Sequence, residues 1–285
     1  MRIVVTGVKG QLGYDCVREL KERGYKDVIG IDKDELDITD EKAVREYFQK
    51  VRPDVIMHNA AWTAVDKAEE CIDIVKKVNV DGVSYIARAA EEIGAKLVYI
   101  STDYVFPGSG ERFYEVDDPT GPISVYGRSK LDGEIAARQC KKTFIVRISW
   151  VFGINGNNFV KTMLALGDTH KELTVVSDQI GSPTYTYDLS KLLCDMIETE
   201  KYGTYHATNE GVCSWAEFAQ EIFNVAGKDV IVHPITTEEY FKNKPIQAKR
   251  PLNSRLSKKS LDEAGFDRLP TWQDALKRYI KELTK

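Results

Sequence analysis

Short apolar runs alternate with longer amphipathic stretches over the first 150 residues of the chain. The apolar runs are rich in Val and Ile and lie at 2–7, 27–32, 54–60, 96–102 and 143–149. Stretches with helical spacing separate them, and such alternation is typical of a parallel sheet with helices on both faces. The runs are apolar throughout, as strands buried on both faces require. The pattern predicts an α/β fold, a Rossmann-type doubly wound parallel sheet with its ligands at the carboxyl ends of the strands.

The regular alternation loosens in the second half of the chain. Helical stretches and two strand-like runs follow one another at 157–166, 173–179, 186–198, 202–208, 214–227 and 272–283. We expect residues 1–150 to form a dinucleotide-binding domain and residues 151–285 to form a smaller, mostly helical substrate-binding lobe. Some segments of the second half are expected to return to the main sheet.

Composition and charge narrow the function classes. Forty basic and forty-four acidic residues give a net charge of -4. No block of like charge is present, whereas a nucleic-acid-binding protein usually has clustered positive charge. No apolar run approaches membrane-spanning length, and the chain opens on a strand-like run rather than an export signal. The five cysteines are scattered without a CxxC pair, and the four histidines lack metal-ligand spacing. We therefore expect a cytoplasmic protein with no nucleic-acid partner, no membrane partner and no metal site.

A glycine-rich loop follows the first predicted strand and opens the first helix. In TGVKGQLG, Gly7 permits a tight turn, Gly10 lets a pyrophosphate approach the backbone, and Gly13 lets the helix pack closely on the strand. The free amides and the dipole at the helix start would face the phosphates. The spacing is GxxGxxG rather than GxGxxG, so a glycine-bearing turn without a ligand is the alternative. Its place after the first strand favours a dinucleotide site.

Asp32 ends the second predicted strand. A carboxylate there accepts hydrogen bonds from both hydroxyls of an adenosine ribose, and it would repel the 2′-phosphate of NADPH. Asp32 therefore favours NADH, whereas the neighbouring Lys33 offsets part of the charge and leaves NADPH as an option. A solvated turn carboxylate is the alternative interpretation.

Tyr126 and Lys130 stand four residues apart on a predicted helix, so they share one face. Thr102 ends the fourth predicted strand, and in a doubly wound sheet both elements reach the same crevice. A cation about 4 Å from a phenol is worth at most about 4 kcal/mol, or up to ~3 pKa units, whereas burial acts in the opposite sense. The three groups predict proton transfer to a carbonyl oxygen. An accidental surface pair of Tyr and Lys is the alternative.

Six blocks of sequence, together with the features above, resemble the dTDP-4-dehydrorhamnose reductases, a branch of the extended short-chain dehydrogenase/reductases. The resemblance covers nearly the whole chain and implies reduction of dTDP-4-dehydro-6-deoxy-L-mannose to dTDP-L-rhamnose. The blocks are MHNAAWTAVDKAE, STDYVFPG, PISVYGRSKLDGE, RISWVFG with GNNFVKTML, SDQIGSPT and RPLNSRLS.

The resemblance also implies roles for individual residues. Tyr126 would protonate the C4 oxygen as a hydride arrives from the nicotinamide, Lys130 would hold the ribose and lower the pKa of the phenol, and Thr102 would bind the carbonyl. Asp103 and Trp150 match positions near the sugar, with a capping carboxylate and a core indole as alternatives. The remaining cofactor positions are Gln11, Leu12, Asp32, Asp37, Ile38, Ala60, Ala61 and Thr63.

Two further expectations concern the residues that bind the substrate diphosphate and a possible metal ion. A guanidinium suits phosphate oxygens, so Arg250 and Arg255 are expected to bind the substrate diphosphate, with exposed loop charges as the alternative. Some relatives are described with magnesium, for which the sequence shows no carboxylate cluster. The oligomeric state, including a homodimer, stays open.

Three other functions share the fold. A sugar-nucleotide dehydratase resembles this chain at Thr102 and Asp103 but carries a Glu next, where this chain has Tyr104. An epimerase would retain its cofactor through the catalytic cycle. A regulatory subunit would bind another enzyme and consume no reduced cofactor.

Overall fold

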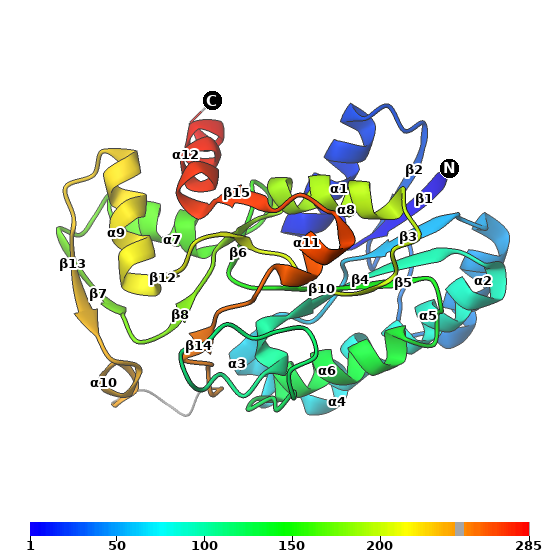
Figure 1. Cartoon of the computed structure of the whole chain (residues 1–285), viewed down its shortest axis with the longest axis horizontal. Coiled ribbons are helices and arrows are strands. Elements are labelled where there is room, and N and C mark those ends of the chain that lie inside the picture. The colour runs from blue at the N-terminus through cyan, green and yellow to red at the C-terminus, as the bar shows by residue number, and fades with distance from the viewer. Residues whose placement is uncertain (243–247, 285) are drawn as a thin grey trace.

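The computed structural model of the chain describes residues 1–242 and 248–284. Within these residues six parallel strands form a sheet in the order β10-β5-β4-β3-β1-β2 (Figure 1). Its strands are β1 (Arg2–Thr6), β2 (Asp27–Ile31), β3 (Val55–His58), β4 (Lys96–Thr102), β5 (Thr143–Ile148) and β10 (Gly203–His206). The α/β doubly wound fold predicted from the apolar runs is confirmed.

Helices cover both faces of this sheet (Figure 1). On β1, Ile3 and Val5 pack with α1 (Gln11–Glu22) and α8 (Thr186–Ile197), whereas Val4 between them packs on the opposite side. Successive side chains of a strand point to opposite faces, so both faces of the run are buried. The opposite side is covered by α2 (Glu41–Val51), α5 (Gly82–Ile93) and α6 (Val125–Ala137).

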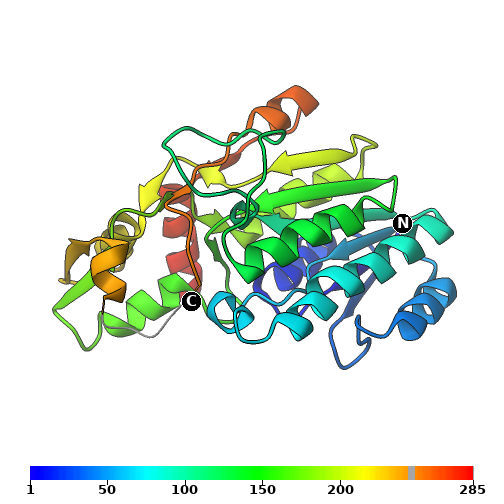
Figure 2. The ribbon, with the colours of Figure 1, turned by 90° about the horizontal axis from the view of Figure 1, so that it is seen from below.

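The second half of the chain contributes to both parts of the molecule. Helix α8 and strand β10 belong to the main sheet layer, and the remainder builds a smaller lobe around its own apolar core. The lobe contains α7 (Phe159–Leu166), α9 (Trp215–Ala226), α12 (Trp272–Leu283) and the pair β7 (Glu172–Val176) and β13 (Ile231–Ile235). Figure 2 shows this lobe at the left, next to the sheet.

Short elements complete the described chain. Of the helices in residues 1–242 and 248–284, none is long and apolar enough to cross a membrane. The short helices are α3 (Val65–Ala68), α4 (Ile72–Lys76), the π-helical η1 (Lys77–Asp81), the 3₁₀-helical η2 (Asp103–Val105), α10 (Thr237–Phe241) and α11 (Lys259–Ala264). The short strands are β6 (Val151–Phe152), β8 (Ile180–Gly181), β9 (Thr184–Tyr185), β11 (Asn209–Glu210), β12 (Cys213–Ser214), β14 (Asn253–Ser254) and β15 (Leu269–Thr271).

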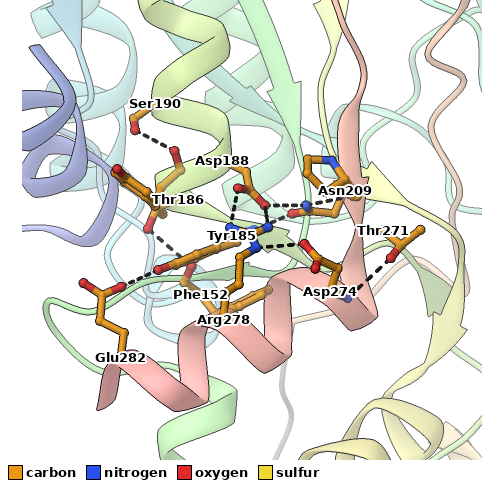
Figure 3. Close-up of polar contacts among 12 residues, drawn as sticks. Phe152, Tyr185, Thr186, Asp188, Ser190, Asn209, Thr271, Asp274, Arg278 and Glu282 are labelled. Carbon is orange, nitrogen blue, oxygen red and sulfur yellow. Dashed lines mark hydrogen bonds and ion pairs between the residues drawn. The ribbon is translucent and has the colours of Figure 1, made fainter. Parts of the chain in front are cut away.

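An ion pair between a half-exposed arginine and a buried carboxylate joins the last helix to the sheet layer (Figure 3). Asp188 in α8, with its side chain only 3% exposed, accepts two hydrogen bonds of 2.8 and 2.7 Å from Arg278 in α12. Asn209 donates a third hydrogen bond to this carboxylate at 2.8 Å. Near the end of α12, Glu282 accepts a hydrogen bond of 2.6 Å from the Tyr185 hydroxyl. Helix α12 is therefore tied to α8 through Asp188 and to β9 through Tyr185.

Replacing Arg278 by Met should destabilise the protein by about 3 kcal/mol, because Asp188 would stay buried without its counter-charge. The free energy of unfolding, measured in urea, tests this. Asp274→Asn is the matched control, because it removes an exposed carboxylate that lies 2.7 Å from the same guanidinium. We expect that variant to lose less than about 1 kcal/mol. Equal losses in the two variants would contradict the importance of the ion pair with Asp188.

Candidate active site

The loop between β1 and α1 is held in a tight turn by its glycines, and its own amides at Val8, Lys9 and Gly10 are hydrogen-bonded. Gly7 has a φ of +69°, and a Cβ there would lie 2.8 Å from the backbone nitrogen of Ala60. A Cβ on Gly13 would collide with the carbonyl oxygen of Gly7. Helix α1 begins without a side-chain cap, so the amides of its first turn face outwards unpaired by any side chain. The helix start therefore has the free donors that a phosphate would need, and the phosphate site stays a prediction.

A cleft of about 650 Å³ opens at the carboxyl ends of the strands. It contains the predicted cofactor loop and the predicted reacting groups side by side. A second pocket of about 410 Å³ adjoins it and is largely apolar. The cleft is lined by Gly7, Gly10, Gln11, Leu12, Gly13, Asp32, Ala60, Ala61, Thr63, Thr102, Asp103, Tyr126, Lys130 and Trp150. The adjoining pocket is lined by Asp32, Asp37, Ile38, Ala60, Ala61 and their neighbours Leu36, Trp62 and Ile74.

Asp32 stands where these two cavities meet. One of its carboxylate oxygens accepts from the backbone N–H of Lys9 at 2.9 Å, and the other accepts from that of Lys33 at 2.9 Å. The Lys9 side chain forms an ion pair with Asp34. The carboxylate is thus held in place, between the glycine loop on one side and the apolar pocket on the other.

The catalytic candidates converge from two elements. Tyr126 and Lys130 lie one turn apart in α6, and Thr102 is the last residue of β4. Ser124 caps α6 by accepting from the backbone N–H of Gly127 at 3.1 Å. Lys130 is 3% exposed, and its ammonium lies 4.2 Å from the centre of a buried tyrosine ring, that of Tyr99.

Burial is the largest influence on the pKa of Lys130 and on that of Tyr126. It lowers the pKa of Lys130 to about 7, although Glu134 acts in the opposite sense. It also raises the pKa of the Tyr126 phenol, with Asp103 acting in the same direction and a hydrogen bond involving Thr102 opposing it. In the cofactor-free protein the phenol is therefore firmly protonated. Burial and Asp103 thus act against the lowering of the phenol pKa that is expected from Lys130.

Two groups that fix α6 were not singled out in the sequence. Asn79, which is buried in the π-helical η1, donates to the Ser129 hydroxyl at 2.9 Å. Ser129 donates in turn to the carbonyl oxygen of Tyr126 at 2.7 Å. No local pattern marks a π-helical turn, although such turns often occur at functional sites.

A buried ion pair lies one turn beyond Lys130. Glu134 accepts from the guanidinium of Arg147 at 2.8 Å through both oxygens, and from Ser101 at 2.6 Å. Both charged side chains are at most 4% exposed. The spacing of Tyr126, Lys130 and Glu134 along one helical face is the signal that could have identified this carboxylate.

Asp103 is tied into the protein beside the cleft. It accepts from the Thr102 hydroxyl at 2.8 Å and binds the Ser254 hydroxyl of β14. Burial raises its pKa to about 6, and these two hydrogen bonds act in the opposite sense. The next residue, Tyr104, packs edge-on against Tyr126 with ring centres 5.4 Å apart. A ring thus occupies the position of the second acid/base of a dehydratase.

An aromatic pocket of about 450 Å³ continues from the cleft towards the smaller lobe. The two cavities share Tyr104, Trp150 and Trp215. Trp150 adopts a φ of +51° and stacks on Trp215 with ring centres 3.8 Å apart. The rest of the lining is mostly apolar and includes Phe159, Met163, Leu166, Leu173, Val175 and Phe241. The aromatic and apolar lining suits the aromatic part of a ligand.

The two arginines expected at a diphosphate occupy different places. Arg250 lines the aromatic pocket and also a neighbouring groove of about 840 Å³. Arg255 lines only that groove and donates to Asn253 at 3.0 Å. In the part of the chain that the structure describes, no group of three or more His, Cys, Asp or Glu side chains is placed to hold a metal ion.

Replacing Lys130 by Met should stabilise the cofactor-free protein at pH 7 by about 3 kcal/mol. The folded pKa of about 7 lies below the ordinary value of 10.5, so the unfolded chain binds more protons between these values. The cost of burying Lys130 is therefore full below pH 7 and disappears as the pH rises to 10.5. Urea denaturation at pH 7 and pH 10 tests both points. The exposed Lys42→Met is the control, and a Lys130→Met protein less stable than the parent at pH 7 would contradict the prediction.

Comparison with known proteins identifies the family. All residues, 1–285, match the family described as RmlD substrate binding domain. The spore coat polysaccharide biosynthesis protein SpsK of Bacillus subtilis is 44% identical over 99% of this chain and 97% of its own length. A dTDP-4-dehydrorhamnose reductase of Aggregatibacter actinomycetemcomitans is 41% identical over 97% of each chain. The crystal structure of a dTDP-4-dehydrorhamnose reductase from Bacillus anthracis in complex with NADP covers 99% of each chain at 44% identity, with a TM-score of 0.94. The chain belongs to the dTDP-4-dehydrorhamnose reductase family.

Proposed function

We propose that this protein reduces the C4 ketone of dTDP-4-dehydro-6-deoxy-L-mannose to give dTDP-L-rhamnose, using NADH or NADPH. One observation carries the proposal: Thr102, Tyr126 and Lys130 line the same cleft as the glycine loop, and that cleft runs into an aromatic pocket. The first cavity suits a dinucleotide and a ketone, and the second suits a nucleotide base.

The reacting groups divide the work of ketone reduction. When bound, the nicotinamide cofactor supplies a hydride. Tyr126 donates its phenolic proton to the C4 oxygen, so that hydride and proton together convert the ketone into an alcohol. Thr102, whose hydroxyl donates to Asp103 in the cofactor-free protein, turns that hydrogen bond to the same oxygen when the ketone is bound. Lys130 stabilises the phenolate left behind, and burial keeps the phenol protonated until the transfer.

The cysteines bear on the cellular compartment of the protein. We place the protein in the cytoplasm because its five cysteines are free, as a reducing compartment requires. The substrate is a small nucleotide sugar, and a homodimer is compatible with the fold. Magnesium has no assigned position among the described residues.

Tyr126→Phe should lower the rate of ketone reduction by about 10³-fold, because it removes the proton donor. The absorbance of the reduced nicotinamide, followed with dTDP-4-dehydro-6-deoxy-L-mannose as substrate, gives the rate. Cofactor binding, measured by fluorescence, should persist. The control is Tyr14→Phe, at a ring that is 45% exposed on α1. Unchanged turnover in Tyr126→Phe would refute the role, and no turnover by the parent protein with either cofactor would favour a regulatory subunit.

Asp32 should make this chain prefer NADH over NADPH. Its carboxylate would lie beside the 2′-phosphate, and the Lys9 ammonium, which is paired with Asp34, leaves only Lys33 to offset part of that repulsion. We expect Asp32→Asn to raise the ratio of NADPH affinity to NADH affinity about tenfold. Fluorescence titration with each reduced cofactor tests this. Glu46→Gln, which removes an exposed charge of α2, serves as the control, and an unchanged ratio in Asp32→Asn would contradict the assignment.

A further inference from the structure

The aromatic pocket combines one cation with one anion. Among the described residues that line it, Arg250 is the only Lys or Arg, and Asp66 is the only Asp or Glu. A nucleotide sugar must place its diphosphate between the base in this pocket and the ketone in the cleft. A carboxylate beside a diphosphate costs free energy, so the presence of Asp66 requires an explanation.

Asp66 holds the segment that carries the arginine. One oxygen accepts from the Arg250 guanidinium at 2.7 Å, and the other accepts from the backbone N–H of Ala248 at 3.2 Å. Arg250 donates back to the carbonyl oxygen of Ala248 at 3.3 Å. These three hydrogen bonds form a closed ring that restrains both the backbone and the side chain.

The guanidinium of Arg250 keeps N–H groups that can donate hydrogen bonds to a ligand. Of its five N–H groups, two are used in the ring, which leaves three. The guanidinium also lies over the ring of Phe241, 5.6 Å from its centre, and the side chain is 22% exposed. A long side chain loses rotamer freedom when it is fixed, and here the fixing precedes ligand binding.

Asp66 also lies on a segment that touches the rest of the site. Thr63 and Val65 line the cofactor cleft just before it. Glu69, just after it, accepts from the backbone N–H of Val125 at 2.9 Å, at the start of the helix that carries Tyr126. The position of Arg250 is therefore set relative to the catalytic helix by one short segment, residues 63–69.

We propose that Asp66 is a positioning residue that holds Arg250 as the diphosphate-binding cation, and that Arg255 does not take part. The inference rests on the proposed function. Arg255 lines only the neighbouring groove and is bonded to Asn253, so it provides a matched control for Arg250.

The test compares a ligand that has the diphosphate with one that lacks it. Binding of dTDP and of thymidine is followed by the fluorescence of Trp150 and Trp215 in the pocket wall. Arg250→Met should raise the Kd of dTDP about 30-fold and that of thymidine less than about twofold. Arg255→Met should change neither by more than about twofold.

Asp66→Ala separates positioning from simple charge. Removing a carboxylate near an anion site would tighten dTDP binding if only the local potential mattered. Positioning predicts the opposite, a Kd for dTDP raised about five- to tenfold with that for thymidine unchanged. Asp66→Asn keeps an acceptor and should recover part of the loss. Asp73→Ala, at an exposed carboxylate of α4, is the control for charge.

Each outcome has a distinct meaning. Unchanged or tighter dTDP binding by Asp66→Ala overturns the positioning role, and so does an equal loss for thymidine, because that indicates a collapsed pocket. A loss in Arg255→Met as large as that in Arg250→Met overturns the division between the two arginines. A parent protein that binds NADH but not dTDP overturns the proposed function and this inference with it.

Discussion

A buried ammonium is the constraint on which the site depends. Lys130 is almost fully enclosed, and an enclosed charge needs a counter-charge nearby. Glu134 supplies it from the next turn of the same helix, and Arg147 and Ser101 satisfy the oxygens of that carboxylate. This network ties α6 to β4 and β5 under the catalytic groups. The same enclosure keeps the Tyr126 phenol protonated and lowers the pKa of the Lys130 ammonium, so one packing arrangement sets the protonation of both groups.

The second half of the chain completes the site rather than forming a separate one. Strand β5 leads directly into Trp150, and its partner in the stack, Trp215, opens α9 of the smaller lobe. Recognition of a nucleotide on the lobe side and chemistry on the sheet side therefore need a fixed relation between the two. The pair of Asp188 and Arg278 supplies part of it, because it binds the last helix to α8. A rigid scaffold matters here because misplacing reacting atoms by about 1 Å costs catalysis heavily.

Local patterns predicted the sheet and the meeting of Thr102, Tyr126 and Lys130 in one cleft. These features depend on neighbours in sequence: continuous apolar runs, a glycine turn and a spacing of four in a helix. Other features depend on contacts between distant segments, which one sequence does not reveal. The pairing of Asp66 with Arg250 spans 184 residues, and the π-helical turn at Asn79 follows from packing rather than from a motif. The direction of the phenol pKa likewise required the depth of burial.

Strand β10 sits at the edge of the main sheet, hydrogen-bonded to β5, and α8 covers one face of the same layer. Cutting the chain at residue 150 would therefore not release an independent nucleotide-binding unit. The severed piece would present β5 as an unprotected edge, together with the bare apolar surface that Leu189, Leu193 and Ile197 normally cover. Such a piece should self-associate, because the two halves of this chain share one sheet and one apolar core.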